Sequence, residues 1–557
     1  MINKIINLDN QLIKYLSQHS RDNILKKIKI GFFALIFIIF VFLFYNMSSG
    51  FWFPNTDNIQ NFVFAKNFAN TNSLEFKNEL NQKFSPSIFG IRGMVIKDNG
   101  AAVPTSMPGY IILLGLLIKI SNYLVYLVNP FFAVLALFYL YRISQLIFKD
   151  KKRAFLVTIL ASVSAPFLFV SNVPFNNIVA TAIFLAGLYY LLKVISCNKP
   201  FSLIDLVYFG IWSGLGLFTR HETIIFYLPA IIYLIIKLFF KNNRKHLKIN
   251  LLYILLSLFV FSAFLAVFVY IDIKLFNSLL GFLSPAGTIL GRSAETVAKV
   301  KSMSLLDRIM PIPDMKSFFI NLKNQIFLVS PIISMLFVFS WYFIYKEKNN
   351  KNLYVILIIT VFFQFWFYFA RRWSGDIFEG SIGTSLARYL LVSWLIIPIF
   401  AVYALDKINQ ILNIKKLYLM LFLLYFVTNL NIFLFSDMGY RYFQSVRKMS
   451  IDNQVLLRQN TPEKSVIFCR LVDRYIYPIR ETAIFSTLAP KNRAHSSAKL
   501  MKELLQNGYK VYIIDEYQYN HKKNYMIDFQ AIIKELGKEK MHVERRNIIP
   551  YIYEVWI

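Results

Sequence analysis

Asp57 is the first acidic residue after the first long apolar block, 30–48, and a helical pattern of apolar residues starts beside it. At the outer surface of a membrane, such a carboxylate could accept a proton from an acceptor hydroxyl while a lipid-linked donor lies alongside in the bilayer. Thr56 or Asp57 could instead cap the helix, because their side chains accept hydrogen bonds from its first amides and an acid complements its dipole. The residues leave both roles open.

Arginine, histidine and tyrosine side chains stand at the ends of several other apolar blocks. A guanidinium can bind an anion such as phosphate through paired hydrogen bonds. The alternative is that these side chains anchor helix ends among lipid headgroups. The residues concerned are Arg220 and His221 at one junction, Arg371 and Arg372 at a second, and Arg388 and Tyr389 at a third.

Three further residues are candidate contacts for an acceptor or substrate. Glu222 follows Arg220 by two positions, so it can hold an acceptor or form an ion pair at the helix end. Arg92 lies in a predicted hairpin over 88–103, whose turn is the Asn-Gly pair in the sequence DNGAAVPTSMPGY at 98–110. The same sequence ends in Tyr110, where Pro-Gly punctuation predicts the start of a helix.

The composition excludes an ordinary soluble protein. Of the 557 residues, 57% are hydrophobic and only 16% are charged, and the apolar residues form blocks long enough to span a bilayer. The net charge of +31 comes mainly from lysines and arginines in short stretches between these blocks, which is the positive-inside pattern of cytoplasmic loops. Because no nucleic-acid-binding motif accompanies the charge, we expect no nucleic-acid partner.

The apolar blocks predict about eleven transmembrane helices. The stretch 108–148 begins outside and ends at the cytoplasmic sequence KDKKR, so it must cross an odd number of times. We therefore predict a helix in the outer interface over 108–120 and one span over 129–148. The other spans are expected at 30–48, 154–172, 176–195, 204–219, 222–240, 249–275, 323–345, 352–370, 388–408 and 416–436.

This arrangement divides the chain into three parts. Residues 1–29 form a cytoplasmic segment, and 30–436 form the transmembrane part, in which the long first outer loop is 49–107. Further outer loops are 171–177, 276–322 and 371–387, so the two longest loops share one face of the membrane. Residues 437–557 are expected to form an extracytoplasmic domain.

The C-terminal part has the pattern of a small α/β domain. Charges become frequent after residue 436, and short strand-like runs alternate with helical patterns. It contains no glycine-rich phosphate loop and no cluster of metal ligands, so we assign no chemistry to it. The expected strands are 465–469, 482–485, 511–514 and 551–556, and the expected helices are 498–506 and 524–536.

The ordered set of motifs resembles the GT-C superfamily of polytopic membrane glycosyltransferases, which includes protein O-mannosyltransferases and lipid A aminoarabinose transferases. The motifs are Asp57 in the long first outer loop, PGY at 108–110, GLGLFTRHE at 214–222 and ARYL at 387–390. The resemblance covers residues 30–410 and implies transfer of a sugar, with inversion, from a polyprenyl-phosphate or polyprenyl-diphosphate donor on the outer face.

The resemblance also implies roles for the candidate residues. Asp57 matches the family's catalytic base, and Arg388 begins the helix whose counterpart is associated with the lipid phosphate. Because negative charge builds on that phosphate as the glycosidic bond breaks, Tyr389, Arg220 and His221 join Arg388 as candidate phosphate ligands.

The chain departs from the family's pattern at two points. Many relatives carry a second acid beside the first and another in the next outer loop, whereas this chain has Asn58 and the carboxylate-free sequence SNVPFNN at 171–177. A hard divalent cation needs several oxygen ligands, and only the distant Asp376 and Glu379 could join Asp57. We therefore predict a reaction without a metal or other cofactor.

Two other functions remain open from the residues. A transporter or flippase of lipid-linked saccharides would also have many spans, although no pair of broken helices recurs in matching halves. A polysaccharide polymerase or ligase would use similar lipid-linked sugars. The expected partners are a polyprenyl-phosphate-linked sugar, an acceptor that is a protein, lipid or glycan, and membrane lipids. We expect a multi-pass protein of the plasma membrane with a cytoplasmic N-terminus.

Overall fold

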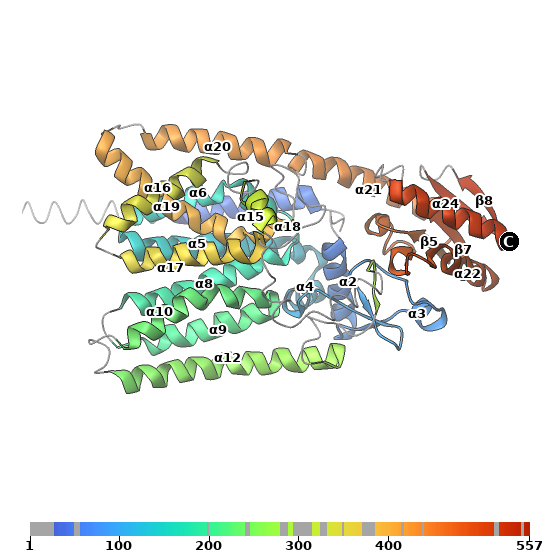
Figure 1. Cartoon of the computed structure of the whole chain (residues 1–557), viewed down its shortest axis with the longest axis horizontal. Coiled ribbons are helices and arrows are strands. Elements are labelled where there is room, and N and C mark those ends of the chain that lie inside the picture. The colour runs from blue at the N-terminus through green and yellow to red at the C-terminus, as the bar shows by residue number, and fades with distance from the viewer. Residues whose placement is uncertain are drawn as a thin grey trace, which may run out of the picture.

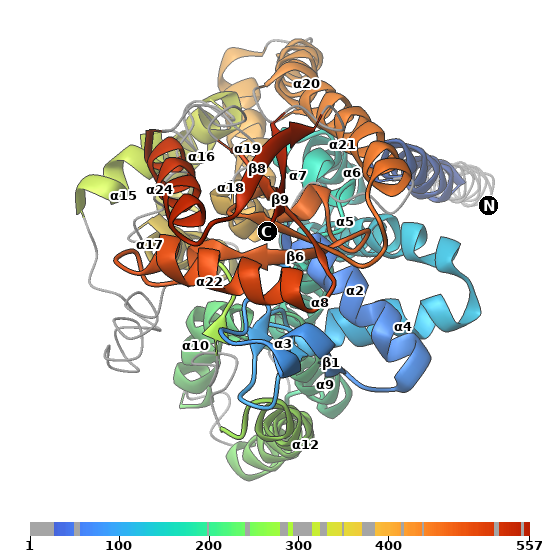
Figure 2. The ribbon, with the colours of Figure 1, turned by 90° about the vertical axis from the view of Figure 1, so that its right-hand side faces the viewer.

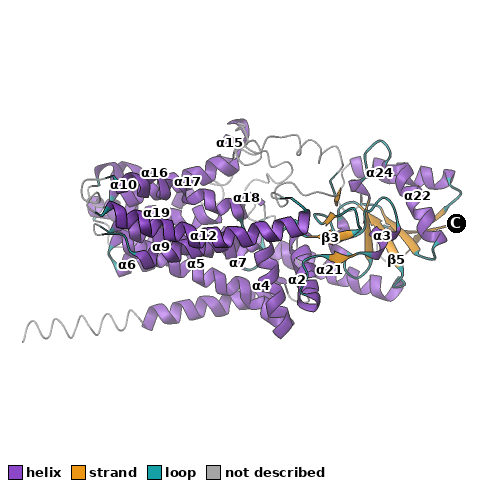
Figure 3. Ribbon diagram, turned by 90° about the horizontal axis from the view of Figure 1, so that it is seen from below, coloured by secondary structure: helices purple, strands orange, loops and turns teal. Residues whose placement is uncertain are grey.

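The computed structural model has a bundle of long helices at one end and two small sheets at the other (Figure 1). The end of the bundle nearest the strands is called the sheet end, and the opposite end, which carries the turn at Lys149, is called the basic end. Figure 3 shows the strands gathered beyond the sheet end. The described residues are 27–48, 56–197, 200–239, 246–278, 288–292, 315–323, 331–347, 350–369, 385–413, 417–436, 439–516, 523–546 and 551–557.

The bundle consists of apolar helices, joined at several points by short 3-10 turns. The first described helix is Lys27–Ser48. It is followed by α4 (Pro108–Ile120), η2 (Asn122–Leu124), α5 (Val125–Phe148), α6 (Lys151–Ser162), α7 (Ala165–Ser171), α8 (Asn176–Ser196), α9 (Leu203–Thr219), η3 (His221–Tyr227), α10 (Leu228–Leu238), α12 (Leu247–Phe276), α15 (Met315–Leu322), α16 (Pro331–Lys346), α17 (Lys351–Phe369), α18 (Ser385–Tyr389), α19 (Leu391–Leu412) and α20 (Leu417–Phe435).

Burial separates central from peripheral helices. The most apolar stretches of α8 and α19 are 89% and 83% buried inside the protein, whereas that of α12 is 6% buried. An apolar helix whose surface is not covered by protein needs lipid around it, and α12 lies at the edge of the bundle in Figure 1. The burial pattern therefore agrees with the expected polytopic membrane protein.

The count of about eleven transmembrane helices is not confirmed, although each predicted span overlaps at least one described helix. Among the described residues, eight helices are long and apolar enough to span, or up to nine if a bent pair is one span. That pair is α6 and α7, which meet at 68°; Pro166 near the start of α7 favours a new helix there. The remaining two predicted spans correspond to α9 and α16, which have 17 and 16 residues and are shorter than the eight spanning helices.

The predicted helix over 108–120 is confirmed as α4, and Figure 1 shows it at the sheet end. A Cβ added to Gly109 would lie 2.5 Å from Cβ and 2.7 Å from the carbonyl oxygen of Phe218 in α9. Only glycine therefore lets α4 approach α9 this closely. This contact gives a packing reason for the glycine of the PGY motif.

The two longest predicted outer loops meet in a small antiparallel sheet, as expected for loops on one face. The sheet has the order β1-β3-β2-β4, and β2 pairs with β4 through Val95 opposite Ile289. β2 and β3 form the predicted hairpin. The elements are α2 (Thr56–Thr71), β1 (Phe76–Lys77), α3 (Glu79–Lys83), β2 (Val95–Ile96) and β3 (Ala101–Val103) from the first loop, and β4 (Thr288–Ile289) from the second.

The C-terminal sheet has five strands in the order β6-β5-β7-β9-β8. β6, β5 and β7 are parallel, and β9 and β8 are antiparallel to their neighbours. The predicted strands and helices are present; the strand β8 and the helix α21 were not predicted. The elements are α21 (Tyr440–Asn460), β5 (Ser465–Cys469), η5 (Val472–Tyr475), β6 (Glu481–Ile484), η6 (Phe485–Thr487), α22 (Arg493–Gln506), β7 (Lys510–Ile514), α24 (Lys523–Lys538), β8 (His542–Arg546) and β9 (Ile552–Trp556).

Backbone hydrogen bonds join the C-terminal sheet to the first loop. The amide of Gly90 donates to the carbonyl oxygen of Thr482 at 2.9 Å, and the amide of Ile484 donates to that of Ile88 at 2.8 Å. Phe89 forms an antiparallel bridge with Ala483. Residues 88–90 thus extend the β6 edge of the sheet, which protects this edge from other chains. Figure 2 shows the resulting layer in front of the bundle.

Candidate active site

A polar cavity of about 280 Å³ lies at the sheet end and is called the sheet-end cavity. Five separate segments contribute to it: the start of α2, the residues just before α4, the start of α8 with the residue before it, the junction of α9 and η3, and α18. Its lining residues are Asp57, Asn58, Asn61, Thr105, Ser106, Met107, Phe175, Asn176, Asn177, Arg220, His221, Glu222, Arg388 and Tyr389.

Asp57 and Arg388 form an ion pair across this cavity, although 331 residues separate them in the chain. Nη2 of Arg388 lies 3.3 Å from Oδ2 of Asp57. The arginine side chain is only 8% exposed, whereas that of Asp57 is 51% exposed. Asp57 lies in the first turn of α2, as predicted. Its carboxylate is therefore both beside a cation and open to an incoming molecule.

The backbone around Arg388 is fixed by hydrogen bonds from two helices. The Asn177 side-chain amide at the start of α8 donates to the carbonyl oxygen of Arg388 at 3.2 Å. The Gln364 side chain in α17 donates to the carbonyl oxygen of Tyr389 at 3.0 Å and accepts from the amide of Ser393 at 2.9 Å. Buried amides that bind the chain at a helix start restrict its orientation.

Aromatic rings line the cationic side of the cavity. The Arg388 guanidinium lies 4.6 Å from the ring centre of Phe175, and that of Arg220 lies 4.2 Å from the ring centre of Tyr389. Tyr389 stacks on Tyr368 with 5.3 Å between ring centres. Cation–π contacts hold guanidinium groups in place while leaving their edges available for hydrogen bonds.

Arg220, His221 and Glu222 form a second charged group in the cavity. Nε of Arg220 donates to Oε1 of Glu222 at 2.8 Å, and Nδ1 of His221 lies 3.7 Å from Oε2 of Glu222. Arg220 has extended backbone between α9 and η3, and its amide donates to the carbonyl oxygen of Gly216. The predicted pairing of Glu222 with Arg220 is therefore present.

Two of the remaining candidate residues, Arg92 and Tyr110, do not line the sheet-end cavity. Arg92 contacts the turn η5 of the C-terminal part, where its Nε donates to Oδ1 of Asp473 at 2.6 Å. Tyr110 is buried in α4, and its hydroxyl donates to the side-chain oxygen of Asn129 at 3.0 Å. Arg371 and Arg372 lie outside the described residues.

Asn58 is a cavity residue that the sequence analysis did not select. Its side chain is 1% exposed, and neither its nitrogen nor its oxygen has a hydrogen-bond partner within the described part of the chain. A buried amide without partners is costly, and this one lines the cavity next to Asp57. The sequence did contain a signal for this residue, because Asn58 occupies the position where many GT-C relatives carry a second acid.

In the described residues, no group of three or more His, Cys, Asp or Glu side chains is arranged to hold a metal ion. Asp376 and Glu379, the two acids that could have joined Asp57, lie outside those residues. A reaction without a metal therefore stays a prediction.

Comparison with known proteins identifies the fold. Residues 104–270, less than a third of the chain, match the family model described as dolichyl-phosphate-mannose-protein mannosyltransferase. No curated protein matches the chain in sequence.

The fold is similar to that of ArnT from Cupriavidus metallidurans. The structure of ArnT bound to undecaprenyl phosphate has a TM-score of 0.57 and 10% sequence identity, and the match covers 94% of this chain and 97% of ArnT. The structure of ArnT in the apo state has a TM-score of 0.53, with 10% identity and coverage of 94% and 98%. The chain therefore has the GT-C fold of an integral membrane protein, as the sequence predicted.

Proposed function

We propose that the chain is a membrane glycosyltransferase that moves a sugar from a polyprenyl-phosphate or polyprenyl-diphosphate donor to an acceptor on the extracytoplasmic face. The observation that carries this proposal is the Asp57–Arg388 pair in the sheet-end cavity. An exposed carboxylate and a buried guanidinium in one cavity match the two charges that such a transfer requires. The GT-C fold and the undecaprenyl phosphate bound by ArnT support the same class of donor.

The guanidinium of Arg388 binds the donor phosphate in this proposal. When the bond between the sugar's anomeric carbon and the phosphate oxygen breaks, its electron pair stays on the phosphate. Arg388 is held by Phe175 and by the Asn177 amide, so it needs little rearrangement to receive this charge. Arg220 supplies a second cation, and the Tyr389 hydroxyl and the His221 ring supply hydrogen-bond donors for the phosphate.

Asp57 acts as the general base. The acceptor oxygen attacks the anomeric carbon from the face opposite the phosphate, which inverts the configuration, and Asp57 takes the acceptor's proton. In the structure the carboxylate contacts Arg388. A donor phosphate that competes for this guanidinium weakens the contact between Arg388 and Asp57.

Asn58 and Glu222 supply hydrogen-bonding groups for hydroxyls of the sugar or the acceptor. The buried amide of Asn58 can both donate and accept, and Glu222 keeps acceptor capacity beyond its contacts with Arg220. Both line the sheet-end cavity beside the charged pair.

The proposed topology places the sheet end outside the plasma membrane. Residues 1–29 are then cytoplasmic, 30–436 contain the catalytic part, and 437–557 form the extracytoplasmic domain. The acceptor is a protein, lipid or glycan that reaches the cavity from this side.

The proposal can be tested with purified full-length protein in liposomes that contain a panel of polyprenyl-phosphate-linked sugars and an extract of envelope acceptors. The measurement is release of polyprenyl phosphate together with transfer of radiolabelled sugar. We expect both to depend on the protein and to be strongly reduced in Arg388→Gln but not in Arg447→Gln; Arg447 is an arginine of α21 outside the cavity. Movement of intact lipid-linked saccharide across the bilayer without its consumption would support a transporter instead.

A further inference from the structure

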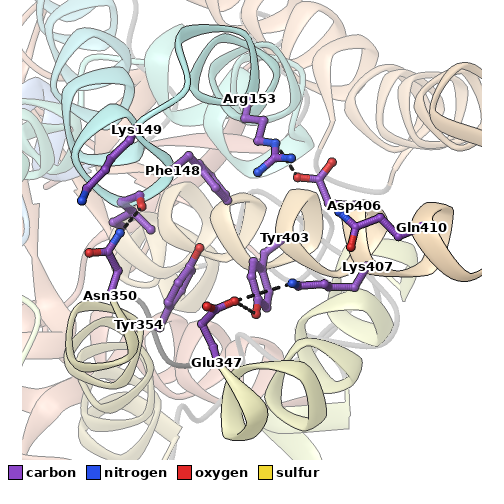
Figure 4. A pocket seen from close by; sticks show the side chains of 11 residues that line it. Phe148, Lys149, Arg153, Glu347, Asn350, Tyr354, Tyr403, Asp406, Lys407 and Gln410 are labelled. Atoms are coloured by element: carbon purple, nitrogen blue, oxygen red, sulfur yellow. Dashed lines mark hydrogen bonds and ion pairs between the residues drawn. The ribbon is translucent and has the colours of Figure 1, made fainter.

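A second polar cavity, of about 350 Å³, lies at the basic end and is called the basic-end cavity. It is enclosed by the end of α5, the start of α6, the turn between α16 and α17, and the last turns of α19. Figure 4 shows charged side chains from these elements around an open space. The proposed function uses none of these residues.

Two ion pairs place carboxylates and cations side by side in this cavity (Figure 4). Nε of Arg153 lies 2.7 Å from Oδ2 of Asp406, and Nζ of Lys407 lies 3.6 Å from Oε2 of Glu347. The hydroxyl of Tyr403 also donates to Oε2 of Glu347, at 2.7 Å. Each carboxylate therefore has a cation beside it.

Lys149 adds a third cation, so the lining residues that the structure describes carry one positive charge in excess; Asp150, whose Oδ2 lies 3.6 Å from Nε of Arg153, is not among them. The Lys149 side chain is exposed, and no hydrogen bond or ion pair holds its ammonium group among the residues that the structure describes. Arg153 and Lys407 are 41% and 34% exposed, so they too can contact a ligand. A group with a single negative charge would neutralise this site.

A tight turn at Lys149 and a side-chain hydrogen bond from Asn350 fix the positions of the charged groups. Lys149 ends α5 with left-handed backbone (φ 53°), so the chain turns directly into α6, and Asp150 accepts from the amide of Lys152 at 2.7 Å. Asn350 has the same backbone region (φ 59°) before α17, and its side chain donates to the carbonyl oxygen of Ile147 at 2.7 Å. This bond ties the start of α17 to the end of α5.

The mixed lining distinguishes between anions. A phosphate dianion would leave the cavity with an excess of negative charge, whereas a phosphodiester carries one charge. A phosphodiester headgroup also carries hydroxyl or ammonium groups. These can donate hydrogen bonds to the carboxylates of Glu347 and Asp406. The basic-end cavity is larger than several water molecules, each of which occupies roughly 30 Å³. It therefore has room for a headgroup of this kind.

We propose that the basic-end cavity binds a singly charged phosphate group, supplied by the phosphodiester headgroup of a phospholipid in the adjoining leaflet. The phosphate contacts Lys149 and the exposed edge of Arg153, and the headgroup's hydroxyl or ammonium group contacts Glu347. Such binding anchors the ends of α5, α17 and α19 to the membrane surface. It is independent of the transfer reaction at the other end.

The test is titration of the full-length chain in detergent with dihexanoyl phosphatidylglycerol, with bound lipid counted by native mass spectrometry. We expect saturable binding of one lipid, weakened about threefold in Lys149→Gln and about tenfold in Lys149→Gln/Lys407→Gln, since each change removes a partly solvated charge contact. Lys152→Gln is the matched control because Lys152 is exposed beside the cavity without lining it. It should bind like the unmodified chain.

Two further probes identify the source of the phosphate. Dihexanoylglycerol, which lacks the phosphodiester, should not bind. If inorganic phosphate displaced the lipid at the same concentrations, the cavity would still be an anion site, but its ligand would be free phosphate and not a lipid headgroup. Absence of saturable binding by both phosphate probes would overturn the proposal, and so would lipid binding that is unchanged in Lys149→Gln or reduced equally in Lys152→Gln. Lys149→Gln alters an exposed side chain, so loss of folding should not obscure the result.

Discussion

Replacement of Arg92 by alanine should weaken the attachment of the C-terminal sheet to the first loop. Arg92 donates through Nε to Oδ1 of Asp473 at 2.6 Å and through Nη2 to the carbonyl oxygen of Leu471 at 2.7 Å. Asp473 is fully buried. Burial alone would lower the pKa of the Arg92 guanidinium, but the Asp473 carboxylate outweighs this effect and raises that pKa.

The loss in free energy of unfolding depends on which hydrogen bonds Asp473 keeps in Arg92→Ala. Removal of one partner from a buried ion pair costs about 3–5 kcal/mol when the other charge is left without compensation. In Arg92→Ala the backbone amide of residue 92 can still donate to Oδ2 of Asp473, as it does at 2.9 Å in the structure. The cost should therefore be smaller, about 2–3 kcal/mol.

Pulse proteolysis in urea, with the C-terminal fragment followed in detergent micelles, measures this free energy. The matched control is Lys97→Ala in the same loop, because Lys97 pairs with Glu75 at 3.2 Å but both side chains are partly exposed. This change should cost less than about 1 kcal/mol. If Arg92→Ala and Lys97→Ala were equally stable, the buried pair would not hold the sheet in place and the reasoning would be refuted.

Three further changes test other parts of the account. Arg388→Gln should lower kcat/KM for the lipid-linked donor by about 100-fold, measured by polyprenyl phosphate release, because the leaving phosphate loses a guanidinium. Burial raises the pKa of Glu481 above its ordinary value of 4.5, so the folded state holds its proton more tightly than the unfolded state. The free energy of unfolding should rise as pH falls from 7 toward 4.5, and Glu481→Gln should reduce this slope in urea titrations. Gly109→Ala should cost about 1–3 kcal/mol in thermal or urea unfolding, since the added methyl group meets the Phe218 backbone.

Each of these changes has a result that would count against it. If Arg388→Gln transferred sugar at the rate of the unmodified protein, Arg388 would have no role in phosphate binding. An unchanged pH slope in Glu481→Gln would mean that other groups set the pH dependence. For Gly109, the control is Gly537→Ala in α24, where nothing lies within 4 Å of the added Cβ; equal effects of the two changes would exclude the helix contact as the cause.

Helices and strands with strong local patterns could be predicted from the sequence. The predicted helix over 108–120 and the strand at 465–469 coincide with α4 and β5. β8 was missed because the sequence HVERR lacks an apolar alternation, as is common for charged edge strands. The bend between α6 and α7 had a signal in Pro166, but the apolar block continued through it.

Long-range pairing could not be read from the sequence. Membrane parity placed Asp57 and Arg388 on one face, yet their contact at 3.3 Å depends on how α2 packs against α4 and how Gln364 holds the start of α19. Residues 88–90 pair with β6 through backbone atoms, which carry no side-chain signal. Arg92 was accordingly selected as a substrate contact, whereas the structure places it against Asp473.

The most direct test of the central claim is the transfer rate of Asp57→Asn with a polyprenyl-phosphate-linked sugar, compared with Asp98→Asn. Asp98 is an exposed acid of the same loop and does not line the sheet-end cavity. With Asp57 as the general base, Asp57→Asn should lower kcat by about 100-fold to 10,000-fold while the donor still binds, and Asp98→Asn should keep the full rate. Full transfer by a normally folded Asp57→Asn protein would contradict the account.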